Sequence, residues 1–157
     1  MLLREVRIED AEALHQLNKN QLGYDVSLTF TRKQLTKLLN DSEEHFFLAW
    51  QDTNSGELCG YVHAHRYESL VVRPACNILA LAVSKEHEKQ GIGRLLMQGI
   101  ENEATKRGFD VIRLNSGTLR IQAHHFYEKL GYVSHKTQKQ FIKELKYKEG
   151  LTVSVED

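Results

Sequence analysis

The sequence predicts an α+β (mixed α/β) fold, in which about four helices cover a mixed, mostly antiparallel sheet of about seven strands. Two observations carry this prediction. Segments with strand character and segments with helical spacing follow one another in the order β-α-α-β-β-β-α-β-α-β-β. A long helix also joins the fourth and fifth strands, and a right-handed crossover of this kind makes the two strands parallel.

The first elements are a strand and two helices. Residues 2–8 alternate in the manner of a strand, and residues 10–21 have the apolar spacing of a helix. Thr31 and Gln34 form a capping-box pattern. We therefore expect a second helix that begins there and runs to about Asn40.

The middle of the chain contains the strands and the helix that matter most for function. Residues 46–51 and 58–67 are rich in aromatic and aliphatic side chains and predict a hairpin. Residues 78–83 are a continuous apolar run, which predicts a fourth strand buried on both faces. A strongly amphipathic helix then begins near Ile92 and ends at Gly108.

The last part of the chain predicts four further elements. Residues 110–114 form a fifth strand, and residues 123–130 have the spacing of a short helix. Residues 132–133 and 140–145 are expected to close the sheet as two more strands.

The composition indicates one soluble domain. The 157 residues fit a single domain, 1–157, and the 21 basic and 21 acidic residues cancel, so no net field favours nucleic acid or an anionic membrane. The longest apolar run is too short to span a bilayer, and the N-terminus lacks the apolar region of a signal peptide. We expect a cytoplasmic protein whose two cysteines are reduced.

The most informative stretch is Gln90-Gly91-Ile92-Gly93-Arg94, between a buried strand and a long helix. Free backbone amides at a helix N-terminus bind phosphate, and glycine lets the phosphate approach the backbone. The alternative is a flexible helix start packed on the sheet. The dinucleotide fingerprint requires a small residue in place of Leu96, and the P-loop requires Lys and then Ser or Thr after the second glycine, so neither motif matches.

Together with a second motif, this turn resembles a known family. Leu81-Ala82-Val83, the turn with Leu95-Leu96, and Ala123-His124-His125-Phe126-Tyr127-Glu128-Lys129-Leu130-Gly131-Tyr132 are similar to motifs of the GNAT superfamily of acetyl-CoA-dependent N-acetyltransferases. The resemblance covers residues 2 to about 145. It implies a GNAT-like acyl-CoA N-acyltransferase fold whose parallel fourth and fifth strands splay apart.

The resemblance also implies acetyl-CoA as co-substrate, without a metal. Its pyrophosphate would lie on the amides of the glycine turn, and its pantetheine arm between the splayed strands. The residues assigned to the coenzyme in this way are Leu81, Ala82, Val83, Lys89, Gln90, Gly91, Ile92, Gly93, Arg94, Asn115, His124 and Tyr127.

Two catalytic roles follow from the resemblance. The hydroxyl of Tyr127 would act as the general acid that protonates the departing thiolate, and the backbone N–H of Val83 would stabilise the negative carbonyl oxygen. Tyr127 also lies on the apolar stripe of its helix, so a purely structural role is the alternative.

Two departures from the family pattern weaken parts of this assignment. Glu88 stands where the family commonly has Arg or Gln, which predicts weaker binding of the coenzyme. Asn77 and Leu79 occupy the region of the fourth strand where many members carry a carboxylate that serves as general base. The general base is therefore not assigned.

Four residues are candidates for binding the acceptor. His63 and His65 alternate on a strand and share one face, where they fit a metal site, a proton relay or two half-buried residues beside the substrate. The resemblance places the acceptor loop between the first two helices, where Tyr24 could contact the substrate and Asp25 could attract its ammonium group. The alternative is an ordinary connection in which Tyr24 packs.

The function expected is transfer of the acetyl group of acetyl-CoA to a primary amine of a small molecule, by direct attack in a ternary complex. Acetylation of a protein or peptide amine, and a non-catalytic coenzyme-A-binding domain of the same fold, are the alternatives. The expected partners are the small-molecule amine and, where the protein assembles, a second copy in a homodimer, with no nucleic acid or membrane.

Overall fold

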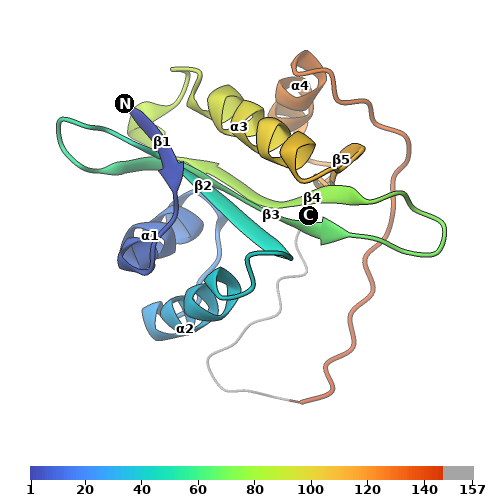
Figure 1. Ribbon diagram of the computed structural model, residues 1–157, viewed down its shortest axis with the longest axis horizontal. Coiled ribbons are helices and arrows are strands. Elements are labelled where there is room, and N and C mark those ends of the chain that lie inside the picture. The colour runs from blue at the N-terminus through green and yellow to red at the C-terminus, as the bar shows by residue number, and fades with distance from the viewer. Residues whose placement is uncertain (147–157) are drawn as a thin grey trace. The chain divides into compact units, whose positions relative to one another are not determined.

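The computed structural model describes residues 1–146 and divides the chain into two compact units. The first unit is Met1–Leu114 and contains the sheet with its covering helices (Figure 1). The second unit begins at Asn115, and its described part contains the helix α4 (Ile121–Lys129).

In the described residues the sheet has five strands, in the order β1 (Leu2–Glu5), β2 (His45–Gln51), β3 (Leu58–Tyr67), β4 (Ala75–Val83) and β5 (Val111–Leu114). Neighbours from β1 to β4 are antiparallel, and β5 is parallel to β4. The predicted mixed, mostly antiparallel sheet and the parallel pairing of the fourth and fifth strands are confirmed.

Helices cover both faces of the sheet in the first unit. Helices α1 (Ala11–Leu22) and α2 (Leu28–Leu39) lie on one face, and α3 (Ile92–Lys106) lies on the other (Figure 1). Two short 3₁₀ turns, η1 (Ile8–Asp10) and η2 (Lys85–His87), precede α1 and α3 respectively.

The predicted amphipathic helices form because their apolar residues recur once per turn. The face of α3 that packs on the sheet consists of Ile92, Leu96, Met97, Ile100 and Ala104, all buried. Gly108 follows α3 and Gly23 follows α1, with φ of 83° and 75°, so glycine ends both helices in the left-handed conformation.

The start of α2 differs from the prediction. The capping residue is Ser27, whose Oγ accepts a hydrogen bond of 3.0 Å from the N–H of Phe30. Thr31 lies inside the helix, and its hydroxyl donates to the Ser27 carbonyl. The prediction of a start at Thr31 was wrong because the Thr31/Gln34 pattern falls one turn after a second residue that can cap a helix.

The fourth strand is longer than predicted and is not buried on both faces. It begins at Ala75, and the side chain of Leu79 is 47% exposed. His63 pairs with Ala80 whereas Ala64 pairs with Ile78, so Leu79 is the extra residue of a β-bulge. The bulge removes Leu79 from the regular alternation, which explains its exposure.

The two last strands predicted at 132–133 and 140–145 are absent from the described part of the chain. Residues 132–146 form no strand there, and Val133, Phe141 and Leu145 are exposed. The fold class stands, with a smaller number of strands. Apolar side chains produced the prediction, but a strand also needs a partner for its backbone groups.

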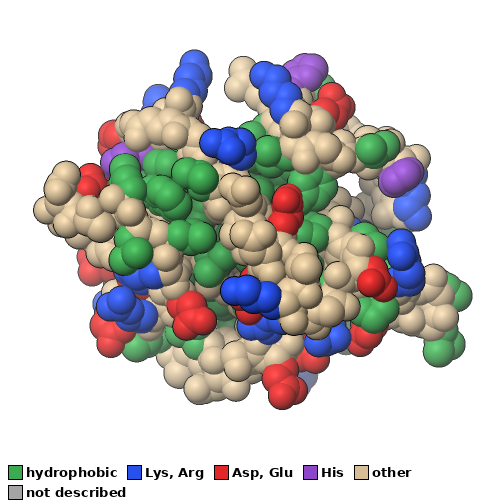
Figure 2. Space-filling view, turned by 45° about the horizontal axis from the view of Figure 1, so that its top comes forward, with side chains coloured by type: hydrophobic (Ala, Val, Ile, Leu, Met, Phe, Trp, Pro, Cys, Tyr) green, Lys and Arg blue, Asp and Glu red, His purple; other side chains and the backbone are tan. Residues whose placement is uncertain are grey.

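The surface agrees with a net charge of zero. In Figure 2 basic and acidic side chains are interspersed on the face shown, rather than gathered in one patch. Among the residues described, no helix combines the length and the apolar composition that crossing a membrane requires.

Candidate active site

Helix α3 begins at a glycine in the left-handed conformation. Gly91 has a φ of 80°, and the first hydrogen bond of the helix runs from the N–H of Leu95 to the Gly91 carbonyl at 3.0 Å. The N–H groups of Ile92, Gly93 and Arg94 therefore precede the hydrogen-bonded ladder of the helix. A Cβ added at Gly91 would have Arg94 Nη2 as its nearest neighbour, 3.9 Å away. The turn thus leaves room for an anion beside the positive end of the helix dipole.

The loop before this turn has charges of both signs. Lys85, Lys89 and Arg94 are exposed, and so is Glu88. Lys89 has a φ of 62°, a conformation that residues other than glycine adopt at an energetic cost and that clusters at functional sites. The positive charges of these three side chains can compensate for the repulsion between the Glu88 carboxylate and a bound polyphosphate.

Strand β4 extends beyond its parallel neighbour. The ladder between them runs from the pair Ala75–Val111 to the pair Ile78–Leu114, where β5 ends, and β4 continues to Val83. The bulge at Leu79 falls directly after the last pair. The pairing of β4 with β5 therefore ends at the bulge, and Leu81 and Val83 lie in the extension of β4 that has no pairing with β5, each half-buried.

Three histidines meet on the face of the sheet that α1 and α2 cover. Nδ1 of His45 lies 3.0 Å from Nε2 of His63, and the rings of His45 and His65 stack with centroids 5.6 Å apart. His63 also stacks on Phe47, at 3.9 Å between centroids and 9° between planes. The structure therefore brings His63 and His65 together, as the alternation predicted, and adds His45 from β2.

A second hydrogen-bonded chain continues from His65 across the next two strands. Nδ2 of Asn77 on β4 lies 3.0 Å from Nε2 of His65, and Nη1 of Arg113 on β5 donates to Oδ1 of Asn77 at 2.6 Å. The guanidinium of Arg113 also lies over the ring of Tyr67, 4.4 Å from its centroid. We call His45, His63, His65, Asn77 and Arg113 the histidine row.

The surroundings of His63 and His65 disfavour the protonated form of both rings. Burial, together with the neighbouring imidazoles of His45 and His65, lowers the pKa of His63 to about 3. Burial also lowers the pKa of His65, with smaller contributions from His45 and Arg113, which Glu44 opposes. No group of three or more His, Cys, Asp or Glu side chains within residues 1–146 is arranged to hold a metal ion.

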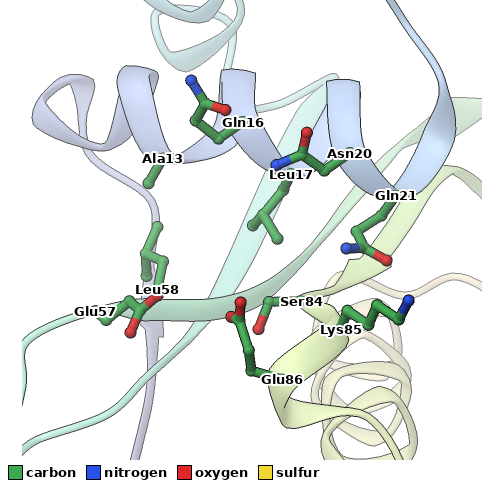
Figure 3. Close-up of a pocket in the computed structure, with 10 residues that line it drawn as sticks. All are labelled: Ala13, Gln16, Leu17, Asn20, Gln21, Glu57, Leu58, Ser84, Lys85 and Glu86. Carbon is green, nitrogen blue, oxygen red and sulfur yellow. The ribbon is translucent and has the colours of Figure 1, made fainter.

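A pocket of about 540 Å³ opens between α1 and the end of β4 (Figure 3). Glu57 and Glu86 lie on its floor, Leu17 points into it from α1, and Gln21 lies across from Lys85. Polar and charged residues outnumber apolar ones in its lining. The histidine row is farther along the same face, beyond Tyr61, and does not line this pocket.

The connection between α1 and α2 carries the two predicted acceptor residues. Tyr24 and Asp25 are both exposed. Tyr24 is close enough to Tyr61 to act on it electrostatically, and the Tyr61 hydroxyl hydrogen-bonds to the side chain of Asn18. Tyr61 precedes His63 by two residues on β3, so the two side chains share a face.

The second unit contains the remaining predicted residues. Nε2 of His124 lies 2.7 Å from the carbonyl of Gly117, and Asn115 is exposed. The ring of Tyr127 makes edge contacts with Phe126 and Tyr132. Burial raises the pKa of Tyr127, and Arg120 opposes this in part.

These features belong to a chain that matches a known family along most of its length. Residues 11–132 match the Acetyltransferase (GNAT) family. The chain belongs to the GNAT acetyltransferase family. The fold agrees, since an aminoglycoside antibiotic 6'-N-acetyltransferase from Acinetobacter haemolyticus superposes with a TM-score of 0.79 at 13% identity, over 93% of this chain and all of that one.

Two further comparisons place this GNAT chain among known proteins. It is 28% identical over 135 residues to the aminoalkylphosphonate N-acetyltransferase of Salmonella typhimurium. The alignment covers 83% of this chain and 83% of that one. An acetyltransferase of Trypanosoma brucei has the same fold, with a TM-score of 0.73 and 16% identity over 90% of this chain and 99% of that one.

The sequence did not point to three polar residues of the site. His45 and Arg113 belong to the histidine row, and Asn18 binds Tyr61. His45 had one available signal, because it precedes Phe47 by two residues in an alternating strand. Its contact with His63 depends on how β2 and β3 pair, which alternation alone does not give.

Proposed function

We propose that this GNAT protein is an acetyl-CoA-dependent N-acetyltransferase that acetylates a primary amine of a small molecule by direct attack in a ternary complex. The observation that carries the proposal is the glycine-started helix α3, whose first amides follow a strand that has extended past its neighbour. Such a turn suits a pyrophosphate, and the open edge of a strand suits an amide-containing arm. Membership of the acetyltransferase family supports the reaction class.

The residues present fit the coenzyme. Residues 81–83 of β4 and residues 89–94 of the turn offer backbone groups, two cationic side chains and the space above Gly91. Asn115, His124 and Tyr127 complete the proposed set. The proposal therefore assigns residues from both units to one reaction and treats residues 1–157 as one N-acetyltransferase domain.

Acetyl-CoA supplies an acetyl group activated as a thioester. In our proposal the backbone N–H of Val83 donates to the carbonyl oxygen as it becomes negative, and the hydroxyl of Tyr127 delivers a proton to the departing sulfur. The raised pKa of Tyr127 suits this role, because the phenol then remains protonated at neutral pH.

Tyr24, Asp25, His63 and His65 are the residues that we propose for the acceptor. An amine is cationic before it reacts, and the exposed carboxylate of Asp25 would attract it. The name of the Salmonella relative describes a small phosphonate-bearing amine as its substrate, which supports a small-molecule acceptor over a protein.

The test is turnover, measured as release of free thiol from acetyl-CoA in the presence of a panel of small primary amines that includes 2-aminoethylphosphonate. Tyr127→Phe removes only the hydroxyl and keeps the ring contacts with Phe126 and Tyr132. We expect kcat to fall about 100-fold, with the melting temperature and the affinity for acetyl-CoA unchanged.

Two other outcomes would count against the proposal. Binding of acetyl-CoA without turnover of any amine would indicate the non-catalytic alternative. A kcat for Tyr127→Phe within about threefold of the parent would assign Tyr127 to packing and leave the delivery of the proton to water.

A further inference from the structure

The hydrogen bonds of the histidine row fix the state of His65. Arg113 can only donate, so the oxygen of Asn77 faces Arg113 and its NH₂ group faces His65. Nε2 of His65 must then accept, and the proton of the neutral ring sits on Nδ1. His65 is therefore already committed, and its accepting nitrogen is not available to another donor.

His63 and His45 have a different arrangement, since one nitrogen of each ring is engaged with the other ring. Two neutral imidazoles share a single proton across the 3.0 Å between His63 Nε2 and His45 Nδ1. When His63 holds that proton, its Nδ1 carries a lone pair and Nε2 of His45 carries the second proton. Neither outer nitrogen has a hydrogen-bond partner among the described residues, so the pair has two open ends.

The pair lies at the point where β4 leaves β5. His63 pairs with Ala80, immediately beside the bulge at Leu79, and the last pair between β4 and β5 is Ile78–Leu114. On the same face of β3 the preceding side chain is Tyr61. Tyr24 of the α1–α2 connection contributes electrostatically to the raised pKa of Tyr61. The end of the β4–β5 pairing and the proposed acceptor loop thus both adjoin the His63 side of the pair.

We propose that His63 and His45 form a two-imidazole proton wire that removes the ammonium proton of the acceptor amine. The inference rests on the proposed N-acetyltransferase function and supplies the general base that β4 lacks. Nδ1 of His63 takes a proton from R–NH₃⁺, His63 passes its Nε2 proton to Nδ1 of His45, and His45 releases its own Nε2 proton to water. The products are R–NH₂ and H₃O⁺, and both rings end neutral with exchanged tautomers.

The tautomers reset when the acetylated amine leaves. Water that enters the vacated position takes the Nδ1 proton of His63, His45 returns its Nδ1 proton to Nε2 of His63, and another water returns a proton to Nε2 of His45. No net charge enters or leaves the pair in this step.

The electrostatics favour a wire over a stationary base. The pKa of His63, about 3, means that the neutral ring does not keep a second proton at neutral pH, so an incoming proton must move on. The ionisable groups that act on His63 are His45 and His65, and His65 in turn is acted on by Arg113 on β5 and by Glu44, which directly precedes β2. His45 is the first residue of β2, after the exposed residues 41–44, and so provides the outer end.

The test is His45→Asn, assayed with 2-aminoethylphosphonate or with whichever amine of the panel the parent acetylates fastest. The shorter amide can still bond Nε2 of His63 but has no second nitrogen that passes a proton onward. We expect kcat/KM to fall about 30-fold or more at pH 7, and to come within about threefold of the parent at a pH above the pKa of the amine, where the proton is already gone. The control is His125→Asn on the exposed face of α4, which should match the parent at every pH.

A second measurement uses the unchanged protein. Because two or more protons move together along the wire, kcat/KM plotted against the fraction of D₂O should curve downward at pH 7 and become straight above the pKa of the amine. A loss for His45→Asn that is equal at all pH values, no loss, or a straight plot at pH 7 would overturn the wire. If the parent acetylates no amine, the proposed function falls and the wire with it; if the parent turns over and these signatures are missing, only the wire falls.

Discussion

The turn that begins α3 and the histidine row are built from different kinds of sequence information. The turn consists of five consecutive residues, and its conformation follows from glycine at position 91 and from the helix that follows. The row takes its members from four strands, and no two of its hydrogen-bonded partners are close in sequence. A local motif can therefore indicate the first region, whereas the second exists only once the strands have paired.

The largest effect should come from breaking the local region. Gly91→Val places a branched side chain in the left-handed conformation and in the space beside the first amides of α3. We expect the affinity for acetyl-CoA, measured by calorimetric titration, to fall about 100-fold, which corresponds to about 2.7 kcal/mol.

The matched control is Gly108→Val at the other end of the same helix. Gly108 has nearly the same φ, 83°, and its added Cβ would also meet little or nothing, so the strain on the fold should be similar. Equal losses of affinity in the two variants would indicate a general effect on stability and remove the turn from the binding site.

The strand pairings explain why the row could not be predicted. In the hairpin Gln51 pairs with Leu58, but a shift of one residue makes Trp50 pair with Gly60 and places His45 opposite His65. Without that shift His45 would lie opposite Ala64, on the other face of the sheet. The bulge at Leu79 has the same effect on Asn77, which it brings opposite His65. Two register shifts, one in the β2–β3 pairing and one in the β3–β4 pairing, therefore bring the residues of the row together, and the composition of the strands does not reveal either shift.

Other successes and failures have the same origin. The helix end at Gly108 was predictable because one residue type decides it locally. The strands expected after residue 131 were wrong because apolar composition does not supply a pairing partner. At the start of α2 two nearby residues, Ser27 and Thr31, could each cap the helix, so the sequence did not decide which of them does.

A smaller effect, confined to the histidine row, should appear in the pH dependence of stability. His63 has a pKa of about 3 in the folded protein and about 6.5 when unfolded, so between these values the unfolded state binds more protons. The free energy of unfolding should therefore decrease as the pH falls, by about 2 kcal/mol from this group between pH 7.5 and 5.0. Urea unfolding at the two pH values, followed by the fluorescence of the single tryptophan, measures it.

His63→Phe tests whether the histidine row causes this decrease. The ring can still stack on Phe47 but no longer titrates, so the variant should lose much less stability on acidification than the parent. Gly91→Val, in the other region, should keep the parent's pH dependence. An identical decrease in the parent and in His63→Phe would assign the acid sensitivity to other groups.

The smallest effect concerns the start of α2, where a local pattern misled. Ser27→Ala removes the oxygen that accepts from the N–H of Phe30 and should lower the free energy of unfolding by about 1 kcal/mol. Thr31→Ala removes the residue that the capping-box pattern favoured, but its hydroxyl only donates to a carbonyl one turn earlier, and alanine has the higher helix propensity, so its effect should stay below about 0.5 kcal/mol. Urea unfolding at pH 7.5 compares the two. A larger loss for Thr31→Ala than for Ser27→Ala would restore Thr31 as the start of the helix, and local patterns would then be better guides to this fold than the structure implies.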